Sequence, residues 1–280
     1  MEILKKNTNT YIFQRDKHNL IIFSPERGGI ITNWLSNNHE ILYFDENRFL
    51  DKNKSIRGGI PILFPICGSL ENNSLFGDNC IKLLQHGFAR DQEWNYEFNQ
   101  FKNTLCLSLS DNELTRKYYP FSFLLKIEIT LTLETLKFDI EIYNKSNEIM
   151  PVNFGMHPYF NISDFRNVQF IDYSKTCLNQ ENNNLANTEN LLKNSSKGID
   201  LLMYSSGKTS FIDNGLKRKI TLLHPYPFDL SVIWSDPPRQ MLCMEPWTSP
   251  RNSLESGPRK IQIMPNSSQM LQTSISIENI

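Results

Sequence analysis

Four short segments of the chain contain most of the residues that could perform acid–base chemistry or bind a polar ligand. Each combines glycine or proline with histidine, arginine, glutamate or aromatic residues at a density that a β-sheet core does not require. They lie far apart in the sequence, at Arg57–Pro61, Gln85–Arg90, Asn153–Phe160 and Met244–Trp247. Strand ends and loops from distant parts of a β-sandwich can converge on one cleft, so these segments are the candidates for a functional site.

Glu245 and His157 each precede a proline, which favours extended backbone geometry for both residues. With strand alternation, Glu245 shares a face with Met241 and Cys243. Burial beside apolar groups raises the pKa of a carboxyl unless a cation or hydrogen-bond donors compensate, and a raised pKa makes a better base at neutral pH. The alternatives are a solvated glutamate at a strand end and a structural histidine, and these residues alone leave both open.

The other histidines have different surroundings. If the segment around His86 is extended, His86 shares a face with Arg90, and a structural role remains the alternative to a functional one. The remaining three are expected at the surface or in structural roles: His18, His39 and His224.

Aromatic residues accompany the polar candidates. Sugar rings present apolar C–H faces and a rim of hydroxyl groups, so a sugar-binding cleft combines aromatic side chains with charged and amide groups. An all-β core also uses Phe and Tyr, so this indication is weak. The candidate aromatic residues are Phe64, Phe88, Tyr159, Phe160 and Trp247.

The elements that must position these side chains are β-strands, because apolar residues recur with a period of two. Alternation over residues 125–133 and again over 138–142 predicts an antiparallel hairpin. Further short strands are predicted at 20–23, 105–109, 219–223, 230–234, 241–244, 260–264 and 271–277. The sequence therefore predicts an all-β fold, a large antiparallel β-sandwich or barrel with little helix. No linker separates the strands, which predicts a single domain over residues 1–280.

One stretch interrupts this pattern, Asn179 to Gly198, which is rich in Asn, Ser and Glu. Its composition predicts a long exposed loop. A solvated insertion is the favoured interpretation, and a lid over a binding cleft is the alternative.

Composition excludes several classes of protein. The chain has 280 residues, with 29 Lys and Arg against 30 Asp and Glu, and this near-neutral balance argues against a nucleic-acid-binding protein. No apolar run approaches the length needed to span a bilayer, and the N-terminus lacks the apolar region of a secretory signal, so we expect a cytoplasmic protein without a membrane partner. Five scattered cysteines without a C-x-x-C pair predict reduced thiols and neither disulfides nor a metal site.

In their order and approximate spacing, the four segments resemble the aldose 1-epimerase (mutarotase) family, which has a galactose mutarotase-like β-sandwich. The matching runs are Arg-Gly-Gly-Ile-Pro from Arg57, Gln-His-Gly-Phe-Ala-Arg from Gln85, Gly-Met-His-Pro-Tyr-Phe from Gly155 and Glu-Pro-Trp-Thr from Glu245. Any one of these runs is a weak signal, whereas all four in order are specific.

The resemblance implies roles for individual residues. His157 would be the general acid and Glu245 the general base that open and close the ring of an aldose, without a metal or cofactor. An acidic residue between the two in sequence would also bind sugar hydroxyls; Asp200 is the best match and Asp213 the alternative. The remaining sugar-binding residues would be Arg57, Gln85, His86 and Arg90.

The substrate and the class of activity have alternatives. Hexose-6-phosphate 1-epimerases share the first two runs, and Arg57 with Arg90 could hold a phosphate, although Glu-Pro-Trp-Thr favours a non-phosphorylated aldose. A sugar-binding module without catalysis is a rival from another class. A glycoside hydrolase would use two carboxylates rather than a glutamate and a histidine. The sequence does not identify the sugar or the oligomeric state.

Overall fold

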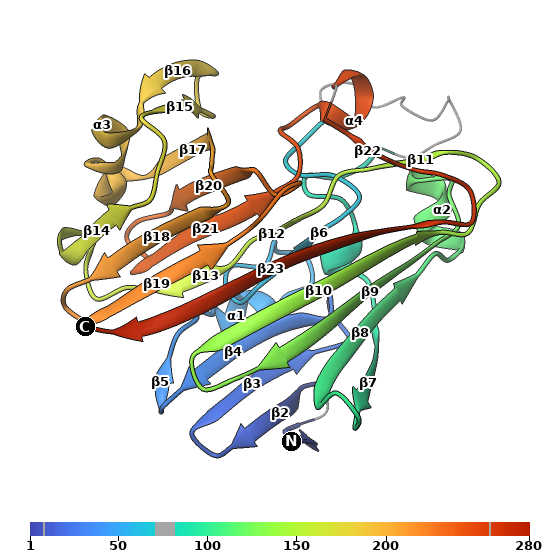
Figure 1. Ribbon diagram of the computed structural model, residues 1–280, viewed down its shortest axis with the longest axis horizontal. Coiled ribbons are helices and arrows are strands. Elements are labelled where there is room, and N and C mark those ends of the chain that lie inside the picture. The colour runs from blue at the N-terminus through green and yellow to red at the C-terminus, as the bar shows by residue number, and fades with distance from the viewer. Residues whose placement is uncertain (8, 71–81, 258) are drawn as a thin grey trace.

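The computed structural model describes residues 1–7, 9–70, 82–257 and 259–280 (Figure 1). Among these residues, one eight-stranded antiparallel sheet runs in the order β14 (Val168–Ile171), β18 (Lys208–Asp213), β19 (Arg218–Leu223), β23 (Ser268–Asn279), β10 (Thr135–Asn144), β9 (Phe123–Leu131), β8 (Thr104–Ser110) and β7 (Asn95–Asn99). We call it the long sheet.

A second sheet, the site sheet, runs in the order β16 (Asn184–Asn187), β15 (Thr176–Asn179), β17 (Ile199–Tyr204), β20 (Leu230–Ser235), β21 (Met241–Trp247), β12 (Gly155–Met156) and β6 (Ile62–Leu63), and β13 (Tyr159–Asn161) also pairs with β21. A third sheet contains β1 (Glu2–Lys5), β2 (Tyr11–Asp16), β3 (Asn19–Ser24), β4 (Ile30–Ser36) and β5 (His39–Glu40). A small ribbon pairs β11 (Met150–Val152) with β22 (Ile261–Ile263).

The helices of the described residues are short and connect strands. They are α1 (Glu46–Leu50), α2 (Glu113–Tyr118), α3 (Thr188–Leu192) and α4 (Ser253–Ser256), with 3₁₀ turns η1 (Ala89–Asp91), η2 (Phe165–Asn167) and η3 (Ser195–Lys197). Among the described residues, none of these helices could reach across a membrane.

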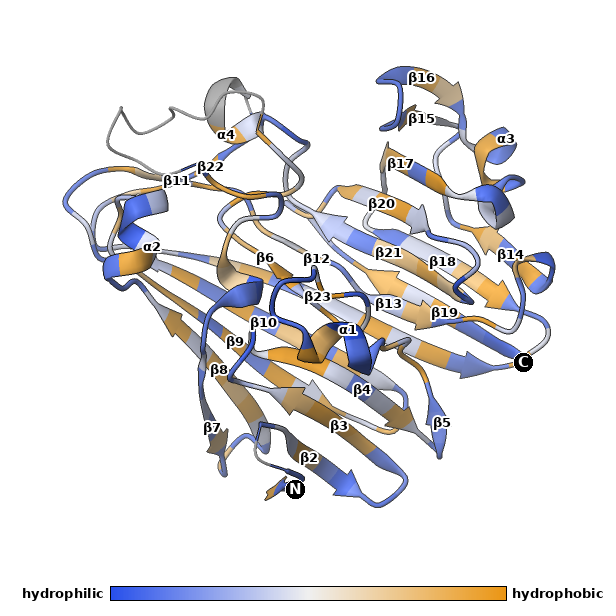
Figure 2. Cartoon of the chain, turned by 180° about the vertical axis from the view of Figure 1, so that it is seen from behind, coloured by the Kyte–Doolittle hydropathy of each residue, from blue (hydrophilic) through white to orange (hydrophobic). Residues whose placement is uncertain are grey.

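The main hydrophobic core lies between the long sheet and the other two large sheets. Its buried members include Phe138 of the long sheet, Met244 of the site sheet and Phe23 of the third sheet. Figures 1 and 2, which view the molecule from opposite sides, show the long sheet stacked against the others, and the colours of Figure 2 show many hydrophobic residues in the strands. This arrangement confirms the predicted antiparallel β-sandwich with little helix.

The predicted strands form where apolar side chains alternate. On β10, every second residue from Leu136 to Asn144 is buried, and Leu136 lies opposite Leu131 of β9, so the hairpin is confirmed. The other predicted runs lie in β3, β8, β19, β20, β21, β22 and β23, with bounds that differ by a few residues at most: β22 is shorter than predicted and the others are longer.

The prediction of a long exposed loop at Asn179 to Gly198 is wrong. This stretch contains the end of β15, then β16, α3 and η3. Its asparagines stabilise structure locally, because the side chain of Asn179 accepts from the backbone of Glu181 and that of Asn187 caps α3 through the backbone of Asn190. A composition rich in Asn therefore reflects turns and a helix cap as well as loops.

The remaining histidines and the cysteines have the expected surroundings. His39 is exposed, His18 is half-buried, and the fully buried His224 bonds to the backbone carbonyl of Phe228 and to the hydroxyl of Thr209. The described cysteines are free thiols at Cys67, Cys106, Cys177 and Cys243, whereas Cys80 lies outside the described residues.

Candidate active site

Backbone pairing brings the four motif segments together. Gly155 of β12 lies opposite both Leu63 of β6 and Trp247 of β21. The backbone N–H of His157 donates to the carbonyl of Pro61 at 3.0 Å, and Phe64 forms an isolated bridge with Gly87. The segments that are separated by up to about 190 positions in sequence are therefore neighbours in one strand network.

Strand alternation then divides core residues from site residues. On β21, Leu242 and Met244 belong to the main core, whereas Cys243, Glu245 and Trp247 face the opposite side. The cavity lies on this opposite side of the site sheet. All seven residues proposed from the sequence line it: Arg57, Gln85, His86, Arg90, His157, Asp200 and Glu245.

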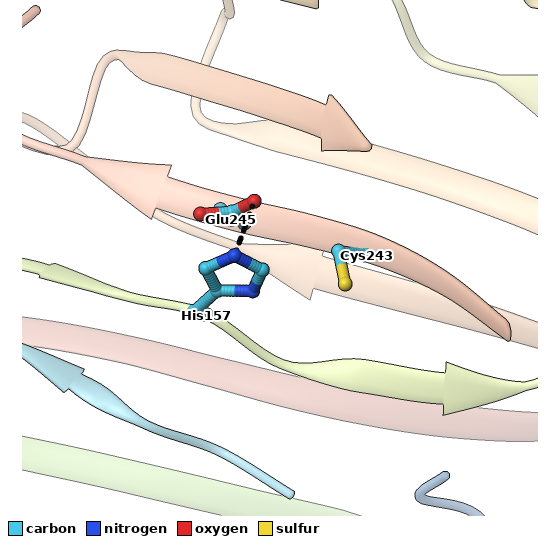
Figure 3. A group of neighbouring side chains, drawn as sticks. All are labelled: His157, Cys243 and Glu245. Carbon is cyan, nitrogen blue, oxygen red and sulfur yellow. Dashed lines mark ion pairs between the residues drawn. The ribbon is translucent and has the colours of Figure 1, made fainter. Parts of the chain in front are cut away.

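Glu245 and His157 are an adjacent acid–base pair. The Nε2 atom of His157 lies 3.3 Å from Oε1 of Glu245, and the two residues are 8% and 1% exposed (Figure 3). The indole N–H of Trp247 donates to Oε2 of Glu245 at 3.0 Å. Because Oε2 is held by Trp247, the carboxylate has a fixed orientation and presents Oε1 to the imidazole.

Burial shifts the titration of both members of this pair. It raises the pKa of Glu245 well above its usual value, and the charge of Asp200 adds to the increase while the Trp247 hydrogen bond opposes it. Burial also lowers the pKa of His157 well below its usual value, and the positive charges of Arg90 and Arg57 lower it further. The expectation of a glutamate with a raised pKa is confirmed.

Two aromatic rings fix the plane of the His157 imidazole. The Tyr159 ring stacks on it with centroids 4.6 Å apart and an interplanar angle of 10°, and the Trp234 ring meets it edge-on at 5.7 Å. These contacts limit rotation of the imidazole, so its Nε2 atom stays directed at Glu245.

His86 is a neutral hydrogen-bond donor on the cavity wall. Its Nδ1 atom accepts from the backbone N–H of Gly68 at 3.1 Å, and burial holds the pKa of His86 well below its usual value. The remaining proton is therefore assigned to Nε2. The segment is not extended, so the condition under which His86 and Arg90 would share a strand face is not met: His86 has φ +67°, and a 3₁₀ turn begins at Ala89.

Arg57 and Arg90 bring positive charge to the cavity. Arg57 lies over the ring of Trp234, with its guanidinium carbon 5.2 Å from the ring centroid, and its Nε is 3.7 Å from Asp236. Arg90 donates to the backbone carbonyl of Gln85 at 2.8 Å, which fixes both residues relative to each other.

Asp200 rather than Asp213 supplies the second carboxylate of the cavity. The carboxylate of Asp213 instead accepts hydrogen bonds from the backbone of Ser163, Gly215 and Leu216, so it holds a turn away from the cavity.

Sequence analysis missed several residues of the cavity wall and misplaced others. Phe64, Phe88 and Phe160 pack in the main core, so only Tyr159 and Trp247 of the candidate aromatic residues line the cavity. The cavity residues that were not proposed are Ser55, Gln180, Val232, Trp234 and Arg251. Alternation along β20 would have found Trp234, because it lies opposite Asp200 and Cys243 in the sheet.

One group of three potential metal ligands occurs among the described residues. The ligand atoms of His157, Cys243 and Glu245 lie within 4.8 Å of one another (Figure 3). The guanidinium groups of Arg57 and Arg90 act on His157 from the same cavity, so a cation here would meet like charge.

Comparison with known proteins identifies the family. The model of the aldose 1-epimerase family matches residues 12–273, so the chain belongs to this family. The crystal structure of the Slr1438 protein from Synechocystis sp. PCC 6803 is similar over 98% of this chain and 97% of that chain, with 32% identity and a TM-score of 0.92.

Two further comparisons concern fold and substrate. A galactose mutarotase related enzyme from Lactobacillus acidophilus shares the fold at 22% identity and a TM-score of 0.79, over 96% of this chain and 97% of that one. A provisionally named glucose-6-phosphate 1-epimerase of Cenchrus ciliaris is 30% identical over 51% of this chain and 44% of its own length.

Proposed function

We propose that the protein is an aldose 1-epimerase that interconverts the α and β anomers of an aldose. The observation that supports this most strongly is the 3.3 Å approach of His157 Nε2 to Glu245 Oε1 inside a cavity that also contains Asp200, Arg57 and His86. A base and an acid at this separation can act on two oxygens of one hemiacetal, the anomeric hydroxyl and the ring oxygen.

Glu245 and His157 divide the two proton transfers. Glu245 takes the proton of the anomeric hydroxyl while protonated His157 delivers a proton to the ring oxygen, and the bond between C1 and the ring oxygen breaks. The open aldehyde rotates about its C1–C2 bond. The ring oxygen then attacks the other face of the carbonyl as both protons return, which restores Glu245 and His157.

The surroundings of the pair favour the proton transfers of ring opening. An unperturbed glutamate is more acidic than an imidazolium by about two pKa units. Burial raises the pKa of Glu245 and lowers that of His157, so both shifts act against this difference. A raised pKa favours gain of a proton by Glu245, and a lowered pKa favours loss of a proton by His157, which are the two transfers of ring opening.

The remaining proposed residues bind the sugar. Asp200 accepts hydrogen bonds from hydroxyls, His86 donates through Nε2, and Arg57, Arg90 and Gln85 complete the polar rim. Trp234 and Trp247 offer apolar ring surface to the C–H face of the sugar.

A hexose 6-phosphate is the second candidate substrate. Arg57 and Arg90 line the cavity with their nearest carboxylates at 3.7 Å, which leaves guanidinium N–H groups for a phosphate. The Cenchrus ciliaris relative carries the name of a phosphorylated-sugar epimerase.

The test is proton NMR or polarimetry of freshly dissolved α-glucose, α-galactose and α-glucose 6-phosphate. We expect the protein to accelerate equilibration of at least one of them. Glu245→Gln should reduce that acceleration by about 10²-fold or more, because it removes one positioned proton transfer.

Each rival function predicts a different result. A sugar-binding module binds sugar without changing the rate of anomerisation, and Glu245→Gln leaves this rate unchanged. A glycoside hydrolase releases reducing sugar from oligosaccharides. Absence of acceleration with all three sugars would exclude the proposed activity on them.

A further inference from the structure

Arg251 holds the second carboxylate of the cavity in place. It lies in the segment that leads from β21 to α4, and its Nη2 lies 2.8 Å from Oδ2 of Asp200. The side-chain amide of Gln180 donates to the other oxygen, Oδ1, at 2.7 Å. Both oxygens of Asp200 therefore have a fixed partner, and each retains lone-pair capacity for a further donor.

Arg251 is itself held between two other segments. Its side chain crosses Gly68 so closely that a Cβ atom there would lie 2.3 Å from Cγ of Arg251. Its Nη1 is 3.5 Å from the backbone carbonyl of Gln180, and the backbone N–H of Asn252 donates to Ser69. These contacts and the hydrogen bond to Asp200 hold the guanidinium beside that carboxylate.

The pair is less exposed than the most exposed ion pairs of the described residues. The side chains of Arg251 and Asp200 are 32% and 22% exposed, whereas Arg166 beside Asp164 is 86% exposed. An ion pair that is partly shielded from water is screened less by salt than an exposed one. The hydrogen bond from Gln180 further restricts the orientation of the Asp200 carboxylate.

We propose that Arg251 is a positioning residue, which orients Asp200 so that this carboxylate can bind the sugar. The proposal takes from the proposed function only that the ligand is a sugar, and it does not depend on catalysis. It predicts that loss of Arg251 weakens sugar binding more than it slows the proton transfers, because Arg251 acts on Asp200 and not on the reacting oxygens.

Arg251 also has an electrostatic effect at Glu245. Its positive charge lowers the pKa of Glu245, in opposition to the negative charge of Asp200. Removing the charge should therefore raise the pKa of the base and move the acid limb of the rate profile to higher pH. The other titratable and charged groups that act on or contact Glu245 are Asp200, Arg90, His157, Tyr159, Cys67 and Cys243.

The experiment compares Arg251→Met with Arg251→Lys, and Arg166→Met serves as the matched control. We expect KM for the best sugar of the panel to rise about tenfold or more in Arg251→Met, with a smaller change in kcat, because a charge-assisted hydrogen bond is lost at the binding stage. The acid limb should move to higher pH in Arg251→Met and return toward wild type in Arg251→Lys. Arg166→Met should behave as wild type.

A second measurement separates this proposal from the proposed activity. Sugar affinity is measured by calorimetry in the Glu245→Gln background, where catalysis is removed, with and without Arg251→Met. Weaker binding in the double variant supports the positioning role even if wild type proves inactive as an epimerase. Unchanged affinity and unchanged KM overturn it.

Asp200→Asn tests whether Arg251 acts through Asp200. If it does, Arg251→Met has a much smaller effect on affinity when Asp200 is already asparagine than when it is aspartate. Equal effects in the two backgrounds would show that Arg251 acts by another route and would overturn the proposal.

Discussion

Glu245 shows how one residue can favour chemistry at the expense of stability. It is 1% exposed, and its carboxylate has the Trp247 indole as hydrogen-bond donor at Oε2. Burial raises its pKa, so the ionised form, which is the proposed base, is also the less stable form in the folded protein.

The pH dependence of activity follows from this raised pKa. The proposed mechanism requires ionised Glu245, so kcat/KM should fall as the pH drops through the raised pKa of this group. We expect the acid limb to lie above pH 4.3, about the ordinary value for glutamate. The measurement is kcat/KM between pH 4 and 9. An acid limb at or below the ordinary value would contradict the assignment of Glu245 as the base.

The same shift predicts a stability effect for Glu245→Gln. A pKa that is raised in the folded state contributes stability below the unfolded pKa, and this contribution is lost as the pH rises through the folded pKa. At pH 8 the neutral amide should therefore be more stable than the ionised carboxylate, by about 1 kcal/mol, and the advantage should shrink toward pH 4.

Thermal unfolding of wild type and Glu245→Gln across this pH range measures the effect. Glu26→Gln is the matched control, because Glu26 is exposed. A Glu245→Gln variant that is less stable than wild type at pH 8 would show that the ionised carboxylate is well accommodated.

At the scale of elements, tight turns bring loop residues to the cavity. Gly87 has φ +73°, and a Cβ atom there would lie 2.1 Å from the carbonyl oxygen of Phe64. Glycine at this position allows the turn that contains His86 to approach β6 closely.

Gly87→Ala should consequently destabilise the fold and reduce activity. Gly198→Ala is the matched control, because Gly198 also has positive φ, at +96°, but the nearest atom to an added Cβ is 3.8 Å away. Gly198→Ala should lower the free energy of unfolding by about 1 kcal/mol, because of the backbone conformation alone. Gly87→Ala should lower it further, because backbone atoms must also move. Urea unfolding measures the free energy of unfolding of both variants. Equal losses would show that the close contact between the added Cβ atom and Phe64 does not destabilise the fold.

Local sequence patterns predict strands better than they predict the cavity wall. Alternation identifies β9 and β10 because one face of each strand is buried, and the family resemblance identifies residues that occur in short recognisable runs. Gln180 and Arg251 belong to no such run, since their positions depend on tertiary contacts with Asp200. Alternation along β20 identifies Trp234 as a cavity residue only when the pairing of β20 with β21 is known.

At the scale of the whole molecule, the site sheet has a different function on each face. Met244 packs toward the long sheet in the main core, whereas Glu245, the next residue, faces the cavity. Alternation along one strand thus separates the residues that stabilise the fold from those proposed to act on sugar.

This division predicts that stability can be reduced without loss of the site. Phe138 on β10 of the long sheet is 1% exposed and belongs to the main core, and it does not line the cavity. Phe138→Ala should lower the free energy of unfolding by about 3–5 kcal/mol, because it removes a buried ring and leaves a cavity.

At a temperature where Phe138→Ala remains folded, we expect its kcat/KM to stay within about twofold of wild type, since the long sheet supports the site sheet from the side opposite the cavity. Phe101→Ala is the matched control, because Phe101 is fully exposed, and it should change neither stability nor activity. Urea unfolding and the anomerisation assay give the two readouts. A large loss of kcat/KM in folded Phe138→Ala would show that core packing in the long sheet determines the geometry between His157 and Glu245, and the two faces of the site sheet would then not be independent.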